Sequence, residues 1–268
     1  MQDAVQEVKA YYDGAVQTEW ERLENHRAEF EITKRFMNRY IKPGDSVLDV
    51  GGGPGRYSLY LAGKGCDVTL VDLSPENAAF AKQKAGEAGL PLRTLAGDAR
   101  VIDAVVEGPF DHVLLMGPLY HLTDECDRAE TVHRCVSLLK PGGLLYVSFI
   151  SSYGGIIYMM KYDPMVLRSS PNEEVFAQLF IDDKPFIGIG FTQNHFIRHK
   201  DVLPFMGQFP LEKLHYFGQE GILAPCEPTI MRQSGDVIER WLTLSEQVCE
   251  REDLLSYSEH LMYIGRKQ

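Results

Sequence analysis

The stretch Ser46-Val-Leu-Asp-Val-Gly-Gly-Gly-Pro-Gly-Arg56 decides how the whole chain is interpreted. It starts as an apolar, strand-like run, passes through a glycine-rich turn and continues into a segment of helical character. Such a turn lets backbone N–H groups approach a ligand closely, and the N-terminus of the following helix favours negative charge. The stretch therefore predicts a cofactor site at the end of a strand.

Two cofactor classes use a glycine-rich turn of this kind. The dinucleotide fingerprint G-x-G-x-x-G/A needs a small sixth residue for close packing of the helix on the strand. Here Gly51 and Gly53 fill the first two positions, but the sixth is Arg56, which argues against NAD. The chain instead has G-x-G-x-G at Gly51, Gly53 and Gly55. Asp49 precedes the turn, and an acid that ends an apolar strand needs partners, either a ligand or the N–H groups of the turn.

Around this stretch, from about residue 45 to 150, short apolar runs alternate with longer segments of helical character. The runs are hydrophobic on both faces, as expected for a parallel sheet covered by helices, and their spacing indicates βαβ crossovers. Ser74 before Pro75 is a typical helix start, and Lys140-Pro-Gly-Gly143 is expected to end another helix. The predicted strands are Ser46–Val50, Asp67–Val71, Pro91–Leu95, Phe110–Met116 and Gly143–Ile150. The predicted helices are Gly55–Gly63, Pro75–Ala88, a short one near Val101–Val106, and Asp124–Leu139.

The ends of the chain follow other patterns. Residues 1–42 predict one or two amphipathic helices, and residues 151–213 lose the alternation and are rich in aromatic side chains. Two final strands are expected at Glu212–Phe217 and His260–Gly265, with the amphipathic segment Asp236–Glu250 between them.

Five motifs in this order resemble those of class I S-adenosylmethionine (SAM)-dependent methyltransferases of the small-molecule type. They are Val47–Gly55, Val68–Ser74, Gly97–Ala99, Phe110–Met116 and Leu138–Leu145. The resemblance implies an α/β fold with a doubly wound, mostly parallel seven-stranded sheet, the Rossmann-like methyltransferase fold, whose final strand is antiparallel. It divides the chain into an N-terminal helical cap (1–42), a SAM-binding core (43–150), an aromatic-rich lid insert (151–213) and the last strands with their helix (214–268).

The resemblance also implies the residues that bind SAM. Asp72 would hold the ribose hydroxyls, which a carboxylate can grip bidentately, and the Asp98 motif would contact the adenine. Asp72 lies 21 positions after Gly51, about one helix plus one strand, which places it at the edge where ligands bind in open α/β sheets. The alternatives are an N-cap acid for Asp72 and a turn aspartate for Asp98. The full predicted cofactor set is Tyr11, Asp49, Gly51, Gly52, Gly53, Asp72, Leu73, Asp98, Ala99 and Met116.

The loop after the fourth strand, Gly117–Leu122, would face the transferable methyl group. Tyr120 and His121 are therefore the candidate catalytic residues, which would orient the acceptor or remove its proton. A base at His121 predicts a rate that rises with pH through about 6.5, the usual imidazole pKa. Alternatively, Tyr120 packs on the cofactor and His121 only bonds backbone.

Several other residues are candidates for covering the site. Tyr11 and Tyr12 resemble, more loosely, residues that fold over the cofactor, while Trp20, Arg22 and Arg27 either cap the site or lie on an exposed helix surface. Four methionines of the insert either line an acceptor pocket or form the core of the insert: Met159, Met160, Met165 and Met206.

His195 and His199 would share one face of a helix, but only Asp201 offers a third ligand, so we expect no metal.

The composition of the chain limits which binding partners and which cellular location are expected. A net charge of −11 disfavours nucleic acid, because such a surface repels phosphates. Five scattered cysteines without a C-x-x-C pair, and a charged N-terminus, predict a cytoplasmic location. The uncharged stretch Pro141–Met160 is long enough to cross a membrane, but its proline and four glycines favour a buried strand, a loop and a helix.

The sequence thus predicts a SAM-dependent enzyme that methylates an O or N nucleophile of a small molecule, with no nucleic acid or membrane partner. Two alternatives stay open: a SAM-binding sensor or scaffold without turnover, because cofactor motifs report binding and not chemistry, and an NAD-dependent oxidoreductase.

Overall fold

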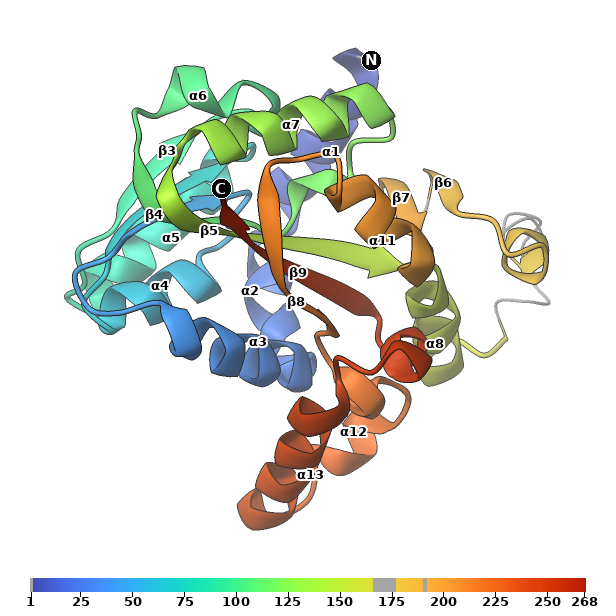
Figure 1. Cartoon of the computed structure of the whole chain (residues 1–268). Helices are drawn as coiled ribbons and strands as arrows, with labels where there is room; N and C mark the ends of the chain where they lie inside the picture. Colours follow the sequence, from blue (N-terminus) through green and yellow to red (C-terminus); the bar gives the residue numbers. More distant parts are fainter. Residues whose placement is uncertain (1, 166–176, 190–191) are drawn as a thin grey trace.

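The computed structural model describes residues 2–165, 177–189 and 192–268. A central sheet has helices on both faces, with α7 (Glu125–Ser137) on one side and α3 (Arg27–Tyr40) and α4 (Arg56–Gly63) on the other (Figure 1). The parallel core comprises β1 (Ser46–Val50), β2 (Asp67–Asp72), β3 (Arg93–Ala96), β4 (Phe110–Leu115) and β5 (Leu139–Ser151), in the order β3-β2-β1-β4-β5.

The last two strands complete this sheet in antiparallel fashion. β9 (His260–Lys267) pairs antiparallel with β5, and β8 (Leu211–Gly218) pairs antiparallel with β9. The predicted mostly parallel fold with an antiparallel final strand is therefore confirmed.

The predicted count of seven strands is wrong, because the described part of the chain forms a nine-stranded sheet. The two extra strands are the hairpin β6 (Phe186–Ile189) and β7 (Gln193–Ile197) from the region expected to be a lid. β4 pairs with β5 only as far as Val147, and β7 then pairs in parallel with Ile150 and Ser151. Part of the predicted lid therefore extends the sheet. It does so because β5 continues beyond the end of β4, and the backbone groups of β5 left without β4 pair with β7.

Side chains that alternate along the strands feed two cores. Leu48 and Val113 belong to the core under α7 (Glu125–Ser137), whereas Val47 and Leu114 pack towards α3 and α4. This alternation explains why the strands are apolar on both faces.

The helices of the core begin and end close to the predicted positions. They are α4 (Arg56–Gly63), α5 (Pro75–Glu87), α6 (Ile102–Val105) and α7, with the short helix η1 (Ala99–Val101) before α6. The Ser74 hydroxyl caps α5 by accepting the Asn77 N–H at 3.1 Å. Several expected boundaries were wrong by a few residues: β3 starts at Arg93, α7 ends at Ser137, and β5 starts at Leu139 and not at Gly143. Lys140–Gly143 lie inside β5 and do not end the helix.

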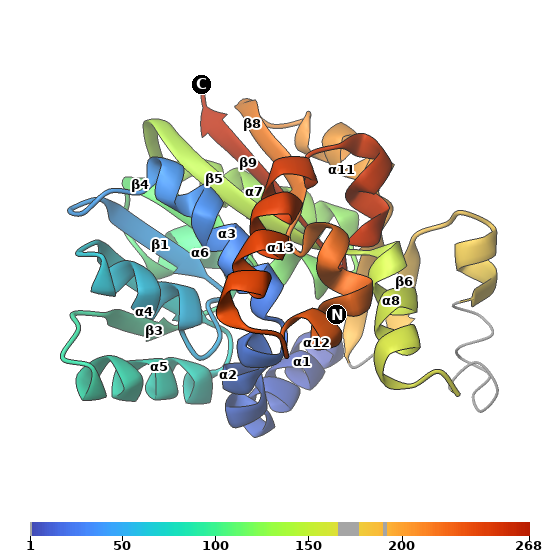
Figure 2. The same cartoon turned by 90° about the horizontal axis from the view of Figure 1, so that it is seen from below.

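The N-terminal region forms three helices, where one or two were expected. They are α1 (Gln2–Gly14), α2 (Val16–Asn25) and α3 (Arg27–Tyr40). α3 packs on the sheet, and its Phe36 ring stacks on Phe217 of β8 at 3.8 Å. α1 contacts α5 and β7, and Figure 2 shows it beside α2.

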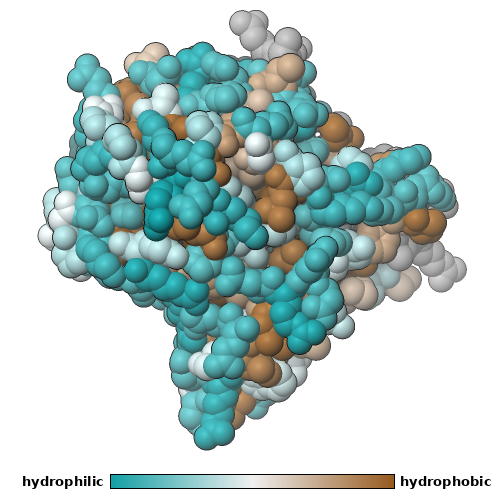
Figure 3. Space-filling view, in the orientation of Figure 1, coloured by the Kyte–Doolittle hydropathy of each residue, from teal (hydrophilic) through white to brown (hydrophobic). Residues whose placement is uncertain are grey.

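The remaining elements are α8 (Ser152–Tyr162), η2 (Pro118–Tyr120), α11 (His199–Met206), η3 (Gly221–Cys226), α12 (Glu227–Ile230), α13 (Gly235–Val248) and η4 (Glu252–Tyr257). Pro141–Met160 is divided between β5 and α8 without the expected loop, because Ser151 ends the strand and its hydroxyl caps the helix. Within the described ranges, no helix is both long and apolar enough to cross a membrane. Hydrophobic and hydrophilic side chains are interspersed on the face that Figure 3 shows.

Candidate functional site

One cavity opens at the carboxyl ends of β1, β2 and β4. Among the residues lining it are these members of the predicted set: Asp49, Gly51, Gly52, Gly53, Asp72, Leu73, Asp98, Ala99, Met116, Tyr120 and His121. Tyr11 is the predicted residue that does not line it, and Tyr12 does. The topology explains the convergence, since parallel strands deliver their following loops to one edge of the sheet.

The glycine turn is built so that side chains would not fit. Gly51 and Gly53 have φ values of +72° and +56°, which favour glycine. A Cβ on Gly51 would lie 2.6 Å from the Pro118 ring, and one on Gly52 would lie 2.7 Å from the Asp49 carboxylate. The turn is therefore pressed between the end of its own strand and the loop after β4.

Asp49 is 3% exposed and accepts a hydrogen bond from the Ser58 hydroxyl at 2.7 Å. Burial raises the pKa of Asp49 to about 7, and the nearby Asp72 carboxylate adds to the rise. The hydrogen-bond partner of Asp49 is thus the Ser58 hydroxyl of α4, and the Asp49 carboxylate packs against the glycine turn at Gly52.

Asp72 ends β2 and binds backbone on both sides of the cavity floor. Its carboxylate accepts the Gly53 N–H at 2.8 Å and the Ser74 N–H at 2.9 Å. Burial raises its pKa, while these hydrogen bonds oppose the rise. Asp72 therefore ties the glycine turn to the second strand.

Asp98 lies at the N-terminus of η1, where it accepts the Arg100 backbone N–H at 2.9 Å. The Arg100 guanidinium also pairs with it at 2.6 Å, and these bonds hold the pKa of Asp98 below its usual value despite partial burial. Arg100, which the sequence did not single out, lines the cavity beside it.

The loop after β4 brings His121 into contact with two distant segments. The Tyr12 hydroxyl lies 2.7 Å from His121 Nε2, and the Gln193 carbonyl lies 3.2 Å from Nδ1. The Thr192 hydroxyl, which can donate or accept, also lies 3.0 Å from Nδ1. A proton on Nδ1 would satisfy the Gln193 carbonyl, which only accepts, and would leave Nε2 to accept from Tyr12. Burial lowers the pKa of His121 to about 4, well below the 6.5 expected from sequence. The ring is therefore neutral at pH 7, and its basic nitrogen faces the Tyr12 hydroxyl.

The neighbouring aromatic residues divide between the cavity wall and its surroundings. Tyr120 lines the cavity with its ring 4.7 Å from that of His121, and burial raises its pKa. Tyr11 packs edge-on against Tyr12 at 5.2 Å and so stands behind the residue that lines the cavity.

Three charged residues of the N-terminal helices also line the cavity, and sequence reasoning found only one of them. They are Glu19, Arg22 and Glu29. Of the other two suggested cap residues, Trp20 packs under Arg56 and against Phe80, and Arg27 is exposed. A helical i, i+3 pairing of Glu19 with Arg22 was the available signal, but only the fold brings Glu29 to the same wall.

The suggested metal pair is not on one helix, because His195 belongs to β7 and His199 begins α11. In the described part of the chain, one other group has ligand atoms close enough to hold an ion: Glu29, Glu220 and His260. Met206 is buried in the core, whereas Met160 and Met165 are exposed, so these methionines do not form a common pocket.

Comparison with known proteins finds similarity to methyltransferases. Residues 47–143 match the family model described as a methyltransferase domain. A ubiquinone biosynthesis O-methyltransferase from Caulobacter vibrioides is 36% identical over 108 residues, which are 40% of this chain and 42% of that protein. A glycine/sarcosine N-methyltransferase from Parasynechococcus marenigrum is 35% identical over 129 residues, 47% of this chain and 46% of that protein. The match thus spans less than half the length of either relative.

Similarity at the level of the fold extends over the whole chain. The crystal structure of the Burkholderia thailandensis 1,6-didemethyltoxoflavin-N1-methyltransferase superposes with a TM-score of 0.61, covering 100% of this chain and 90% of that chain at 15% sequence identity. The resemblance to SAM-dependent methyltransferases and the Rossmann-like methyltransferase fold are therefore confirmed.

Proposed function

We propose that this protein transfers the methyl group of SAM to an O or N nucleophile of a small molecule. One observation carries the proposal: a single cavity joins the glycine turn, the acid that ends β2 and the acid that follows β3 to a hydroxyl–imidazole pair. The class of the matching domain and the named activities of the relatives support it.

SAM supplies an electrophilic methyl group on a sulfonium. Asp72 has carboxylate lone pairs for the ribose hydroxyls, and its hold on the Gly53 N–H keeps the turn in shape. Asp98 and Ala99 would contact the adenine. Gly51, Gly52 and Met116 would lie along the rest of the cofactor.

Tyr12 and His121 are placed to receive the proton that the acceptor loses. Methyl transfer from bound SAM would leave a neutral thioether and a methylated acceptor that has to lose a proton. The acceptor's proton passes to the Tyr12 oxygen while the Tyr12 proton moves to His121 Nε2. A proton on Nδ1, donated to the Gln193 carbonyl, would leave Nε2 as the acceptor for this transfer. Most of the rate would still come from alignment in a water-poor cavity.

Isothermal titration with SAM, S-adenosylhomocysteine (SAH) and NADH tests the cofactor. We expect SAM and SAH to bind, and Asp72→Ala to weaken SAM by about 1.5–3 kcal/mol, the scale of a hydrogen bond to a charged group. Asp67→Asn, at the exposed opposite end of β2, is the matched control and should bind normally. NADH binding tighter than SAM would contradict the proposal.

Turnover is tested separately with labelled SAM and a pool of small metabolites. We expect label in a small product whose O or N is methylated. SAM binding without any product would favour the sensor or scaffold alternative.

A further inference from the structure

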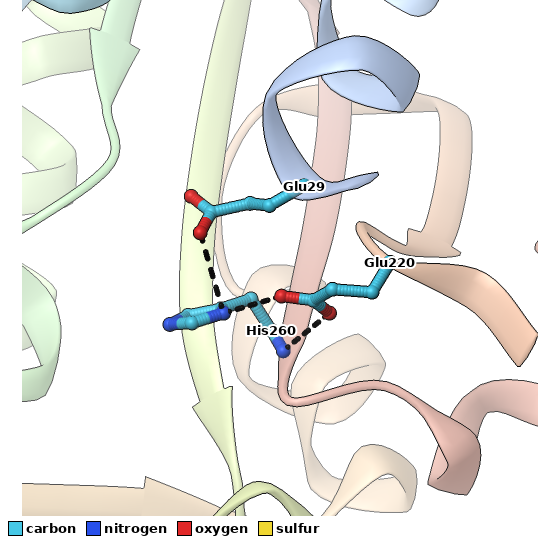
Figure 4. A group of neighbouring side chains, drawn as sticks. All are labelled: Glu29, Glu220 and His260. Carbon is cyan, nitrogen blue, oxygen red and sulfur yellow. Dashed lines mark hydrogen bonds and ion pairs between the residues drawn. The ribbon is translucent and has the colours of Figure 1, made fainter. Parts of the chain in front are cut away.

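A line of alternating charges runs from the cavity wall into the interior. The Arg22 guanidinium grips Glu29, with Nη1 2.7 Å from Oε2 and Nη2 3.3 Å from Oε1. Glu29 Oε2 lies 3.7 Å from His260 Nδ1, and this nitrogen lies 2.7 Å from Glu220 Oε1. Figure 4 shows His260 between the two carboxylates, which approach it from separate segments. The line therefore links α2 and α3 to the start of the last strand.

Burial makes this arrangement costly unless every charge has a partner. Glu29 is 3% exposed and Glu220 is fully buried, and two buried carboxylates are strongly disfavoured without cations beside them. Glu220 also accepts the His260 backbone N–H at 3.0 Å, so its second oxygen is used as well. Arg22 and His260 thus already supply the positive charges that a bound metal ion would bring to this group.

We propose that His260 is a positioning residue of the cavity: as an imidazolium between Glu29 and Glu220, it keeps Glu29 charged and aimed at Arg22. Glu29 in turn fixes the orientation in which the Arg22 guanidinium faces a ligand. Among these four residues, Arg22 and Glu29 line the cavity, and His260 and Glu220 act through them. The inference rests on the proposed function, because the probe is SAH.

The surrounding charges agree with a protonated His260. Burial alone would lower the pKa of His260, but Glu29 and Glu220 raise it to about 9. Burial likewise opposes ionisation of Glu29, but Arg22 and His260 bring its pKa down to about 2. The array is therefore complete at pH 7.

Two further titratable groups face the imidazole, His26 from the N-terminal helices and Glu259 from the preceding position. Burial and the Arg22 charge lower the pKa of His26 to about 4, so His26 is neutral at pH 7 and His260 carries the positive charge. As the pH rises through about 9, His260 loses its proton, Glu29 loses a partner, and the hold on Arg22 weakens.

The test follows the SAH dissociation constant from pH 7 to 10 in the full chain, by titration calorimetry. Glu220→Gln should lower the pKa of His260 by about one to three units, the range caused by a neighbouring opposite charge. The alkaline loss of affinity should then start at correspondingly lower pH. Glu212→Gln, an exposed glutamate on β8, is the matched control and should follow wild type, including any effect of the SAH amine itself.

His260→Gln should weaken SAH binding at pH 7 by about 5- to 150-fold, a usual range for coupling between two sites. In a protein that already carries His260→Gln, adding Glu220→Gln or adding Glu212→Gln should give the same pH profile of SAH affinity. If His260 had a purely structural role, its replacement would lower SAH affinity equally at every pH. The pH at which alkaline conditions weaken SAH binding would then be the same in Glu220→Gln and the control.

Nuclear magnetic resonance titration of the His260 ring in wild type needs no variant to fold. A ring that titrates near 9 supports the proposal, and one that titrates at or below about 6.5, the usual imidazole value, overturns it. Identical pH profiles for Glu220→Gln and Glu212→Gln would overturn it too. Wild type that fails to bind SAH at pH 7 would instead contradict the proposed function.

Discussion

Burial changes the chemistry expected of single residues in the cavity. His121 looked like an ordinary imidazole, yet enclosure lowers its pKa to about 4 and leaves a neutral ring at physiological pH. Asp49 moves in the other direction, because the same loss of water raises its pKa to about 7. Neither shift is visible in residue type or spacing, since both arise from what surrounds the side chain.

The proton transfer proposed for Tyr12 and His121 predicts a particular pH dependence. kcat should rise as the pH rises through about 4, where His121 becomes neutral, and His121 should contribute no further change at higher pH. His121→Ala and Tyr12→Phe should each lower kcat by about 10²–10⁴-fold if general-base catalysis is used. Steady-state kinetics from pH 4 to 8 measure both effects.

His133→Asn, on an exposed face of α7, is the control and should leave kcat unchanged. A change of kcat near pH 6.5 that disappears in His121→Ala would contradict the buried, neutral base. Normal kcat in both site variants would leave alignment alone as the source of the rate.

At the scale of elements, the glycine turn depends on how closely β1, the turn and β2 approach one another. A Cβ on Gly52 would lie 2.7 Å from Asp49 Oδ2 and 2.8 Å from Leu70 Cδ1 of β2. Neither neighbour can retreat easily, because both are buried.

Gly52→Ala should therefore lower both the free energy of unfolding and SAM affinity. Overpacking of this kind typically costs about 1–3 kcal/mol. Gly86→Ala in α5, where a Cβ would meet open space, is the control and should be neutral or stabilising. Urea unfolding and titration calorimetry give the two quantities, and a Gly52→Ala protein that matches the control in both would refute the crowding argument.

A second element, α8, is held by buried charges. Lys161 lies 2.5 Å from Glu259 and 3.7 Å from Glu227, and its side chain is 2% exposed. Lys161→Met should destabilise the protein by about 3–5 kcal/mol, since it leaves the carboxylates buried without their cation. Denaturant unfolding measures this, with exposed Lys82→Met as the control at under about 0.5 kcal/mol. Equal stability of the two variants would show that the pair does not anchor α8.

At the scale of the whole molecule, the site joins parts of the chain that are far apart in sequence. Tyr12 of α1 contacts His121, and His121 contacts Gln193 of β7, so helix, loop and hairpin meet at one imidazole. The N-terminal helices thus form part of the cavity wall, and the hairpin contacts that wall through His121.

This arrangement predicts that SAH slows hydrogen exchange in α1 and β7 together. Exchange in α13, which projects away from the sheet in Figure 1, should not change. In Tyr12→Phe the added protection of α1 should shrink while that of β7 remains, because only the Tyr12 hydroxyl bond is lost. Mass-spectrometric exchange measures all three segments, and unchanged exchange in α1 and β7 would mean that neither segment responds to the cofactor.

The sequence by itself determined the parallel core and its glycine turn. β1 was predicted at Ser46–Val50, where it lies, and the Asp72 position followed from counting one helix and one strand. These features are local: the period of apolar residues, the caps and the glycines act over a few positions, so they can be recognised without knowing the fold.

Only the tertiary structure decided the strand added by β7, the pairing of Tyr12 with His121 and the line from Arg22 to His260. Tyr12 and His121 are 109 positions apart, and no local pattern records which distant side chain will fill a given space. The same holds for the pKa values, because burial and neighbouring charge depend on packing. The cavity lies at the carboxyl ends of the parallel strands, which the sequence predicts. Long-range packing determines which side chains form its walls.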